Sequence, residues 1–209
     1  MTNPDLTRLV IVADRSGSMH GIAGDMNGAI RQLLVEQATQ PGTLVVDIVT
    51  FDTVVEYPYT GVAPADVTDD IIRPRGSTAL NDAVGLTIAK LGAELSSLAE
   101  DDRPGHVIVV VVTDGMENAS REYTTQQVKA MVEEQTGKWG WTFLYLAANV
   151  DAFATGAGYG FARGQTMQYA PTARGAGQTI SVAGDSITRT RSGLDADFTD
   201  DEREAAVQS

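Results

Sequence analysis

The 209-residue sequence contains no cysteine and few basic residues. The absence of cysteine excludes disulfides, thiolate metal ligands, iron–sulfur clusters and a cysteine nucleophile. Fifteen Lys and Arg residues stand against 28 Asp and Glu residues, which gives a formal net charge of −13 at pH 7. Such a field repels polyanions, so we expect neither a nucleic acid nor an anionic membrane surface as a partner.

Long hydrophobic runs are also missing. The longest apolar run covers residues 107–112, far short of the roughly 20 residues that cross a bilayer. The first residues show no basic segment that leads into an apolar core, so we expect no signal peptide and a cytoplasmic protein. Hydrophobic residues make up 43% and charged residues 21%, which are ordinary values for a folded globular chain.

Predicted strands and helices alternate along the chain. Continuous apolar or β-rich runs predict buried strands, at residues 9–13, 43–51, 54–57, 106–113, 141–148 and 167–170. Helical spacing and helix-start signals predict helices between them, at residues 24–38, 79–98 and 124–136, near Asp151, and from Pro171 onward. We expect Gly137 to cap the third of these helices, and residues 58–77 to form a long loop. This order indicates one α/β domain, a twisted, mostly parallel sheet with helices on both faces.

The composition changes after Gly193. Residues 194–209 carry six acids and one base, so we divide the chain into a domain over residues 1–193 and an acidic tail. Thr199 and Glu202 fit a capping box, which is typical of a short docked helix. We expect a frayed, solvated tail instead, because few apolar residues there offset the ordering entropy.

Three polar clusters follow predicted strands or begin a predicted helix. They are Asp14-Arg-Ser-Gly-Ser18 after the first strand, Gly76-Ser-Thr78 before the long helix, and Thr113-Asp-Gly115 after the valine-rich strand. Doubly wound sheets place their sites at the carboxyl ends of strands. If the first and the valine-rich strands are neighbours, Asp14 and Asp114 meet there and repel each other unless a hard cation lies between them.

The donors in these clusters are all oxygens. Small oxygen ligands that leave room for water suit Mg²⁺, with Ca²⁺ or Mn²⁺ as possible substitutes. Helix capping and turn formation would explain any one cluster alone. They do not explain the three clusters in this order.

Together these clusters resemble the von Willebrand factor A domain and its metal-ion-dependent adhesion site. The resemblance rests on Asp14-x-Ser16-x-Ser18, on Thr78 in Gly-Ser-Thr-Ala-Leu, and on Asp114 in Thr-Asp-Gly, and it covers about residues 7–160. A helical extension to about residue 190 completes the predicted domain. The segments 113–120 and 147–151 look like those of cytoplasmic bacterial and bacteriophage members.

The resemblance implies a fold, a set of ligands and a function. The implied sheet is Rossmann-like and six-stranded, in the order 3-2-1-4-5-6 with the third strand antiparallel. Ser16, Ser18 and Thr78 would offer hydroxyl oxygens to the metal, and Asp14 and Asp114 would bind it directly or through water. In this family an acidic side chain of a partner protein completes the coordination. The implied function is therefore a non-enzymatic, metal-dependent protein-binding module.

Two other functions stay open. One is a metal-dependent, phosphatase-like hydrolase in the same crevice, although no second acid follows Asp14 by two residues and no lysine lies near the motifs. The other is a scaffold or assembly subunit in which the metal site is not essential. The acidic tail is a possible pseudo-ligand for the metal, and it has an alternative dock on nearby basic residues, namely Arg163, Arg174, Arg189 and Arg191.

Several further residues near the motifs have both a functional and a structural interpretation. Glu117 and Asn118 follow Asp114, and they either rim the site or serve as ordinary helix-start residues. Arg15 and Arg75 either meet a partner carboxylate or lie solvated. The remaining residues are interpreted as structural or as bystanders, namely His20, His106, Asp82, Trp139, Trp141 and the glycines of 156–160.

Overall fold

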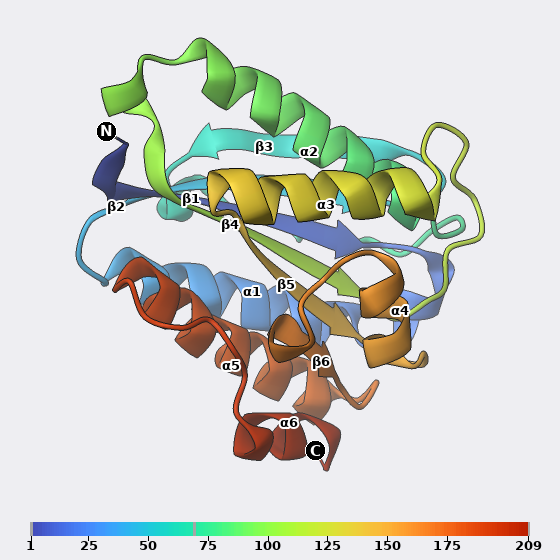
Figure 1. Cartoon of the computed structure of the whole chain (residues 1–209). Coiled ribbons are helices and arrows are strands. Elements are labelled where there is room, and N and C mark those ends of the chain that lie inside the picture. The colour runs from blue at the N-terminus through green and yellow to red at the C-terminus, as the bar shows by residue number, and fades with distance from the viewer. Residues whose placement is uncertain (1, 69, 209) are drawn as a thin grey trace.

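The protein is described by a computed structural model that covers residues 2–68 and 70–208 (Figure 1). Its strands are β1 Asn3–Asp14, β2 Thr43–Phe51, β3 Val55–Val62, β4 Pro104–Thr113, β5 Thr142–Ala147 and β6 Thr166–Gln168. Its α-helices are α1 Ala23–Ala38, α2 Leu80–Ser97, α3 Thr125–Trp139, α4 Ala152–Gly158, α5 Ala173–Arg191 and α6 Asp200–Val207. None of these helices is long and apolar enough to cross a membrane.

The six strands form one sheet in the order β3-β2-β1-β4-β5-β6. Only the β2–β3 pair is antiparallel, and the other pairs are parallel. Val10 at the centre of β1 lies opposite Asp47 of β2 on one side and opposite Val109 of β4 on the other. The predicted fold class, strand order and strand directions are confirmed.

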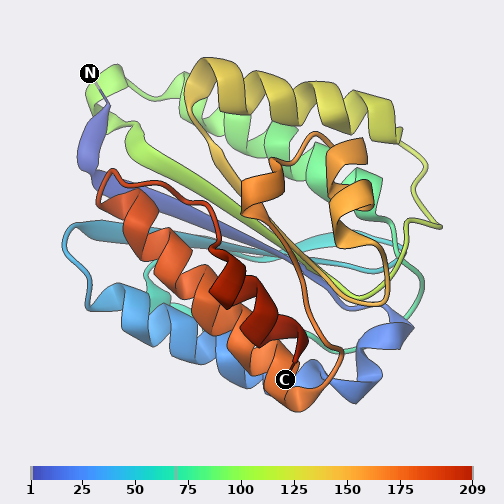
Figure 2. The ribbon, with the colours of Figure 1, turned by 60° about the horizontal axis from the view of Figure 1, so that its bottom comes forward.

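Helices cover both faces of this sheet. Figures 1 and 2 show α1, α5 and α6 on one side, and α2 and α3 on the other. Successive residues of β1 contribute to different cores, because side chains alternate along a strand. Leu9 and Ile11 pack toward α1 and α5, whereas Val10 and Val12 pack toward α2 and α3. The continuous apolar run of β1 therefore reflects burial on both faces.

One predicted helix end is wrong. α3 continues through Gly137 to Trp139, and Gly140 adopts the left-handed conformation that ends it, with φ 68°. Glycine takes this conformation without the steric cost that a Cβ brings. Gly137 lies inside the helix, where a Cβ would meet nothing within 4 Å. Trp139 is thereby placed at the helix end with 55% of its surface exposed, so it is not a core residue.

The predicted loop over residues 58–77 is too long, because β3 continues to Val62. Pro58 lies inside this strand, and proline cannot donate a hydrogen bond to a neighbouring strand. β3 is the edge of the sheet, where one side needs no such donor. Asp69, which belongs to the rest of the loop, lies outside the described residues.

The prediction of a frayed C-terminal tail is also wrong. Thr199 and Glu202 form the capping box of α6, and Phe198 and Ala206 are buried in the core beside α5. The Ser186 hydroxyl donates a hydrogen bond to the carbonyl of Ala196 at 2.5 Å. These few apolar contacts are reinforced by backbone and ionic bonds, which the composition of the tail does not reveal.

The predicted dock of the tail on arginines is found at one of the four positions named. Arg189 of α5 pairs with Glu202 at 2.9 Å and donates to two backbone carbonyls of the segment before α6. Gly164 fits against the same segment, because a Cβ on it would overlap the carboxylate of Asp197. In this structure the tail completes the α5 face of the molecule.

A buried ion pair links β1 to β2. Arg8 binds both carboxylate oxygens of Asp47, at 2.7 and 2.9 Å, and reaches Glu94 of α2 at 3.0 Å. Gly61 of β3 donates its N–H to the same aspartate at 2.6 Å. This group of charges therefore joins three strands and one helix within the body of the sheet.

Candidate metal centre

Asp14 ends β1 and lies fully buried. Its Oδ1 accepts a hydrogen bond from the backbone N–H of Ser16 at 2.7 Å, and its Oδ2 accepts one from the Thr113 hydroxyl at 2.6 Å. Thr113 ends β4, which is the neighbour of β1 in the sheet. The predicted meeting of the first and the valine-rich strands at one edge is confirmed.

The two serines of the first motif connect Asp14 to Asp114. The hydroxyl oxygens of Ser16 and Ser18 lie 3.0 Å apart, and Ser18 donates its hydrogen to Oδ1 of Asp114 at 2.5 Å. Because Ser18 has only one hydroxyl hydrogen, Ser16 donates to Ser18. Four of the five predicted ligands thus form one continuous chain of hydrogen bonds.

Thr78, the fifth predicted ligand, reaches the same place from the start of α2. It exchanges two hydrogen bonds with Asn118: its N–H donates to Oδ1 at 2.9 Å, and its carbonyl accepts from the Asn118 N–H at 3.0 Å. A Cβ on Gly115 would meet the Thr78 hydroxyl at 3.2 Å and the Ser18 hydroxyl at 3.6 Å. Both hydroxyls therefore lie against the same residue, directly after Asp114.

The two carboxylates are held without a balancing charge. Burial raises the pKa of Asp14 to about 6, despite the hydrogen bonds from Thr113 and Ser16, and the charge of Asp114 adds to the rise. Burial also raises the pKa of Asp114, against the hydrogen bond from Ser18. Within the described residues, no arginine or lysine forms an ion pair with either.

The donor set fits a hard divalent cation. Two carboxylates and three hydroxyls converge, and such oxygen ligands are preferred by Mg²⁺, Ca²⁺ and Mn²⁺. No cluster of three or more His, Asp or Glu side chains suited to a metal occurs in the described part of the chain. A cation here would therefore depend on the hydroxyls as much as on the carboxylates, and it would offset the repulsion between Asp14 and Asp114.

Glu117 organises the loop after β4 instead of rimming the site. Its two carboxylate oxygens accept hydrogen bonds from the N–H groups of Ala119, Ser120 and Asn81 and from the Ser120 hydroxyl. Glu117 is structural, although it lies in the loop before α3 and not at a helix start as the sequence suggested. Asn118 holds Thr78 in place, which the sequence did not suggest.

Asp82 has a similar role that the sequence analysis missed. Its carboxylate accepts three backbone hydrogen bonds, from Arg121, Glu122 and Tyr123, at 2.8 to 2.9 Å. An acid in the first turn of a helix is explained well enough by the helix dipole, so its sequence position gave no signal for this contact. Asp82 fixes the far end of the same loop to α2.

Arg15 and Arg75 form ion pairs with acidic residues of the protein itself. Arg15 binds Asp52 at 2.8 Å and Glu56 at 2.7 Å, and Arg75 binds the same two residues at 2.6 Å each. The hypothesis that these arginines meet a partner carboxylate is therefore not supported. Hydrogen bonds from both arginines lower the pKa of Glu56 to about 2. The pKa of Asp52 is lowered too, since its bonds to Arg75, Val54 and Arg15 outweigh its burial.

Asp52 joins the loops that carry the candidate ligands. Beyond its two arginines, its backbone carbonyl accepts the N–H of Ala79 at 2.8 Å, next to Thr78. Gly76 packs against it with φ +67°, and a Cβ there would come within 2.9 Å of the Thr53 hydroxyl. The N–H of Gly17 then donates to the Gly76 carbonyl at 3.2 Å. Asp52 and these contacts fix the loop after β1 against the loop before α2.

Neither histidine belongs to the site. His20 is exposed and has no contact that places it with the ligands. His106 lies near the start of β4, at the other end of the strand from Asp114, and burial and the charge of Arg191 lower its pKa. Both are consistent with the bystander and structural interpretations.

Neither a protein-family profile nor a curated protein matches this sequence. Solved structures do match its fold. Proximal thread matrix protein 1 from the mussel byssus has a TM-score of 0.62 at 14% identity, over 88% of this chain and 46% of its own. A von Willebrand factor type A protein from Catenulispora acidiphila has a TM-score of 0.60 at 10% identity, over 88% and 42%. With the observed strand order, these matches decide the architecture. The fold is that of a von Willebrand factor A domain.

The von Willebrand factor A fold recurs in further matched structures. One is a mutant of the PilB minor pilin from Streptococcus sanguinis, with a TM-score of 0.60 at 13% identity over 87% of this chain and 61% of its own. Another structure of the mussel protein is described as having a zinc-occupied metal-ion-dependent adhesion site motif. This chain spans about half the length of the structures that it matches. At these identities the likeness establishes the fold alone.

Proposed function

We propose that this chain is a non-enzymatic protein-binding module that uses a divalent metal to capture an acidic side chain of a partner protein. The observation that carries the proposal is the hydrogen-bonded series Asp14–Ser16–Ser18–Asp114, with the Thr78 hydroxyl beside it. The zinc-occupied motif in a protein of the same fold supports a divalent metal. The hard oxygen donors of this chain favour Mg²⁺ over zinc, which takes nitrogen and sulfur ligands more often.

The roles of the residues follow from their chemistry. Ser16, Ser18 and Thr78 would hold the metal through hydroxyl oxygens, and Asp14 and Asp114 would hold it directly or through water. The three hydroxyls carry no charge, and an aspartate that binds through water neutralises the ion less than one that binds it directly. A carboxylate from a partner's Asp or Glu is then an attractive additional ligand. The two arginines beside the motifs are paired with acids, so neither is available to hold a phosphoryl group as a hydrolase would require.

The first test is titration calorimetry with Mg²⁺ on protein stripped of metal. We expect one site in the wild type and none in Asp14→Asn. Asp185→Asn is the matched control, since Asp185 is an exposed aspartate on α5, and it should bind as the wild type does. Equal binding by all three proteins would place the metal elsewhere and overturn the proposed ligand set.

The second test addresses the acidic ligand, with acetate as the probe. If acetate completes the coordination, saturating acetate raises the affinity for Mg²⁺, and Mg²⁺ raises the affinity for acetate by the same factor. The factor should fall to one in Asp114→Asn. If stripped wild-type protein fails to bind Mg²⁺ even with excess acetate, the metal-dependent function is wrong, and the scaffold hypothesis replaces it.

The net charge of −13 also predicts how salt changes the rate of association with a partner. An acidic partner is repelled at long range, and salt screens this repulsion over about 8 Å at physiological ionic strength. Association with an acidic partner should therefore become faster as salt is added, the reverse of the usual behaviour of steered complexes.

A further inference from the structure

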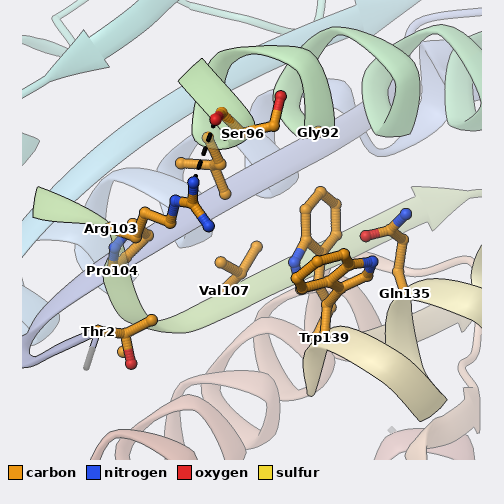
Figure 3. Close-up of a pocket in the computed structure, with 11 residues that line it drawn as sticks. Thr2, Gly92, Ser96, Arg103, Pro104, Val107, Gln135 and Trp139 are labelled. Atoms are coloured by element: carbon orange, nitrogen blue, oxygen red, sulfur yellow. Dashed lines mark hydrogen bonds between the residues drawn. The ribbon is translucent and has the colours of Figure 1, made fainter. Parts of the chain in front are cut away.

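A cavity of about 260 Å³ opens near the amino end of β4, whereas the candidate metal centre lies at the carboxyl end of the same strand. Its walls come from the last turns of α2 and α3 and from the first residues of β4 (Figure 3). Asp14 and Asp114 follow the carboxyl ends of β1 and β4, whereas Pro104 and Val107 lie in the amino-terminal half of β4. The cavity is therefore distinct from the metal centre, and what it binds does not depend on the function proposed above.

One side of the cavity is aromatic and apolar. It contains both tryptophans of the chain: Trp141 is buried, and Trp139 is 55% exposed. Leu95 and Val107 complete this side with buried aliphatic surface. An exposed indole beside a buried one gives a flat ligand two aromatic surfaces for contact, and aromatic pairs gain energy beyond the area they bury.

The other side of the cavity is cationic. Arg103 donates from Nε to the carbonyl of Leu98 and from Nη2 to the carbonyl of Ser96, each at 3.1 Å. These two bonds fix the guanidinium at the wall of the cavity. Figure 3 shows the guanidinium of Arg103 on one side and the indole of Trp139 on the other, with Val107 between them. Gln135 adds a side-chain amide next to Trp139.

We propose that this cavity binds a small, flat aromatic acid, with its ring against Trp139 and its carboxylate on Arg103. The volume is slightly below the roughly 300 Å³ at which sites for drug-sized ligands begin, which limits the ligand to about two fused rings. Three exposed acids at residues 100–102 directly precede Arg103. The guanidinium must therefore supply the attraction for an anion at contact, because the surrounding field is negative.

The two tryptophans make this proposal directly measurable. In a ¹H–¹⁵N correlation spectrum the protein has only two indole N–H signals, and both report on the cavity. Naphthalene-2-carboxylate is the probe, and 2-naphthalenemethanol is its neutral counterpart with the same ring system. We expect the acid to shift both indole signals saturably, with an affinity about tenfold higher than that of the alcohol, as a charge-assisted hydrogen bond provides.

Two variants separate the ring contact from the charge contact. Trp139→Ala removes an exposed side chain, so the fold should survive while binding of both probes is lost. Arg103→Gln should remove the preference for the acid and leave binding of the alcohol unchanged, and Arg103→Lys should keep part of the preference. Arg73→Gln is the matched control, because Arg73 is exposed and lies outside the cavity.

Three results would overturn the proposal. The first is an absence of indole shifts at millimolar probe. The second is equal affinity for acid and alcohol in the wild type. The third is an acid preference that persists in Arg103→Gln while the ligand-free spectrum shows a folded protein. Because no metal enters these titrations, their failure would leave the metal-dependent function unaffected.

Discussion

Two groups of charged residues bind an arginine to a buried aspartate, one within β1 and β2 and the other directly after these strands, and they differ in what they hold together. Arg8 and Asp47 join strands that the sheet already pairs, with Gly61 and Glu94 added at the side. Arg15 and Asp52, with Arg75 and Glu56, join loops that no ladder of the sheet connects. The first group stabilises the scaffold, and the second sets the positions of Ser16, Ser18 and Thr78.

The comparison shows that the same ion pair serves different purposes within a strand and directly after it. Removing one partner of a buried ion pair is costly at either place, because the other charge is left without compensation. Only the second group lies between the loops of the candidate metal centre. Measurements of unfolding free energy and of metal affinity in variants of each group therefore distinguish their roles.

The largest expected effect comes from the two aspartates themselves. Asp47→Asn and Asp52→Asn should each lower the free energy of unfolding by about 3 kcal/mol, as measured by urea denaturation. Mg²⁺ affinity should fall in Asp52→Asn and stay unchanged in Asp47→Asn. Equal affinity in both variants would mean that the Asp52 group is structural only.

Asp14 is a third buried aspartate, and it has no arginine. Its pKa is raised to about 6, so its ionised form destabilises the metal-free fold above that pH. Asp14→Asn should therefore stabilise the metal-free protein by about 3 kcal/mol at pH 7, given about 1.4 kcal/mol per pKa unit. The gain should shrink as the pH falls below about 6 and disappear only well below pH 3.8, where Asp14 is protonated in both the folded and the unfolded state. A loss of stability at pH 7 would show that the hydrogen bonds to Ser16 and Thr113 outweigh the charge.

Each charged group also lies against a glycine with positive φ. These two glycines give a matched pair of substitutions. Gly61 has φ +66° and space around it, since the nearest atom to a Cβ would be Arg8 Nη1 at 3.6 Å. Gly76 has φ +67°, and a Cβ there would lie only 2.9 Å from the Thr53 hydroxyl. Both alanine variants pay about 1 kcal/mol for the left-handed conformation. Gly76→Ala should lose more stability than Gly61→Ala, and it alone should weaken Mg²⁺ binding.

The smallest effect concerns acid stability. The pKa of Glu56 is lowered to about 2 from a usual value of 4.5, so its stabilisation is complete above pH 4.5 and disappears as the pH falls toward 2. Its side chain is 49% exposed, so solvent limits the contribution to less than about 1 kcal/mol. Unfolding free energy measured from pH 5 to pH 2.5 should fall less steeply in Glu56→Gln than in the wild type. Glu94→Gln, in the Arg8 group, is the control for a simple change of charge.

The sequence predicts that the candidate ligands lie close together, because each is found near a strand end or a helix start. Asp14 and Asp114 must meet once β1 and β4 are neighbours, and their local motifs are short and specific. The residues that position these ligands are harder to find. Asp52 contacts arginines 23 and 37 residues away, and Asp82 looks like any acid in the first turn of a helix.

Two of the errors in the fold concern a helix end and the C-terminal tail. Gly137 and Gly140 are both plausible helix ends by residue type, and the left-handed residue that ends α3 is Gly140. The tail is short of apolar residues, yet Phe198 and Ala206 find places in a core formed by α5. For the tail the deciding contacts are tertiary, and the local composition does not reveal them.

The position of β1 at the centre of the sheet has a consequence for how the molecule folds. The hydrogen bond between Thr113 and Asp14 spans 99 residues, and the parallel pairing of β1 with β4 has the same long reach. Contacts so distant in sequence form slowly, because the entropy of closing a long loop is lost before the contacts lower the free energy. The two carboxylates of the candidate metal centre thus come together only when this closure is achieved. Metal uptake during refolding should therefore report the last cooperative step, after local helices and the β2–β3 hairpin have formed.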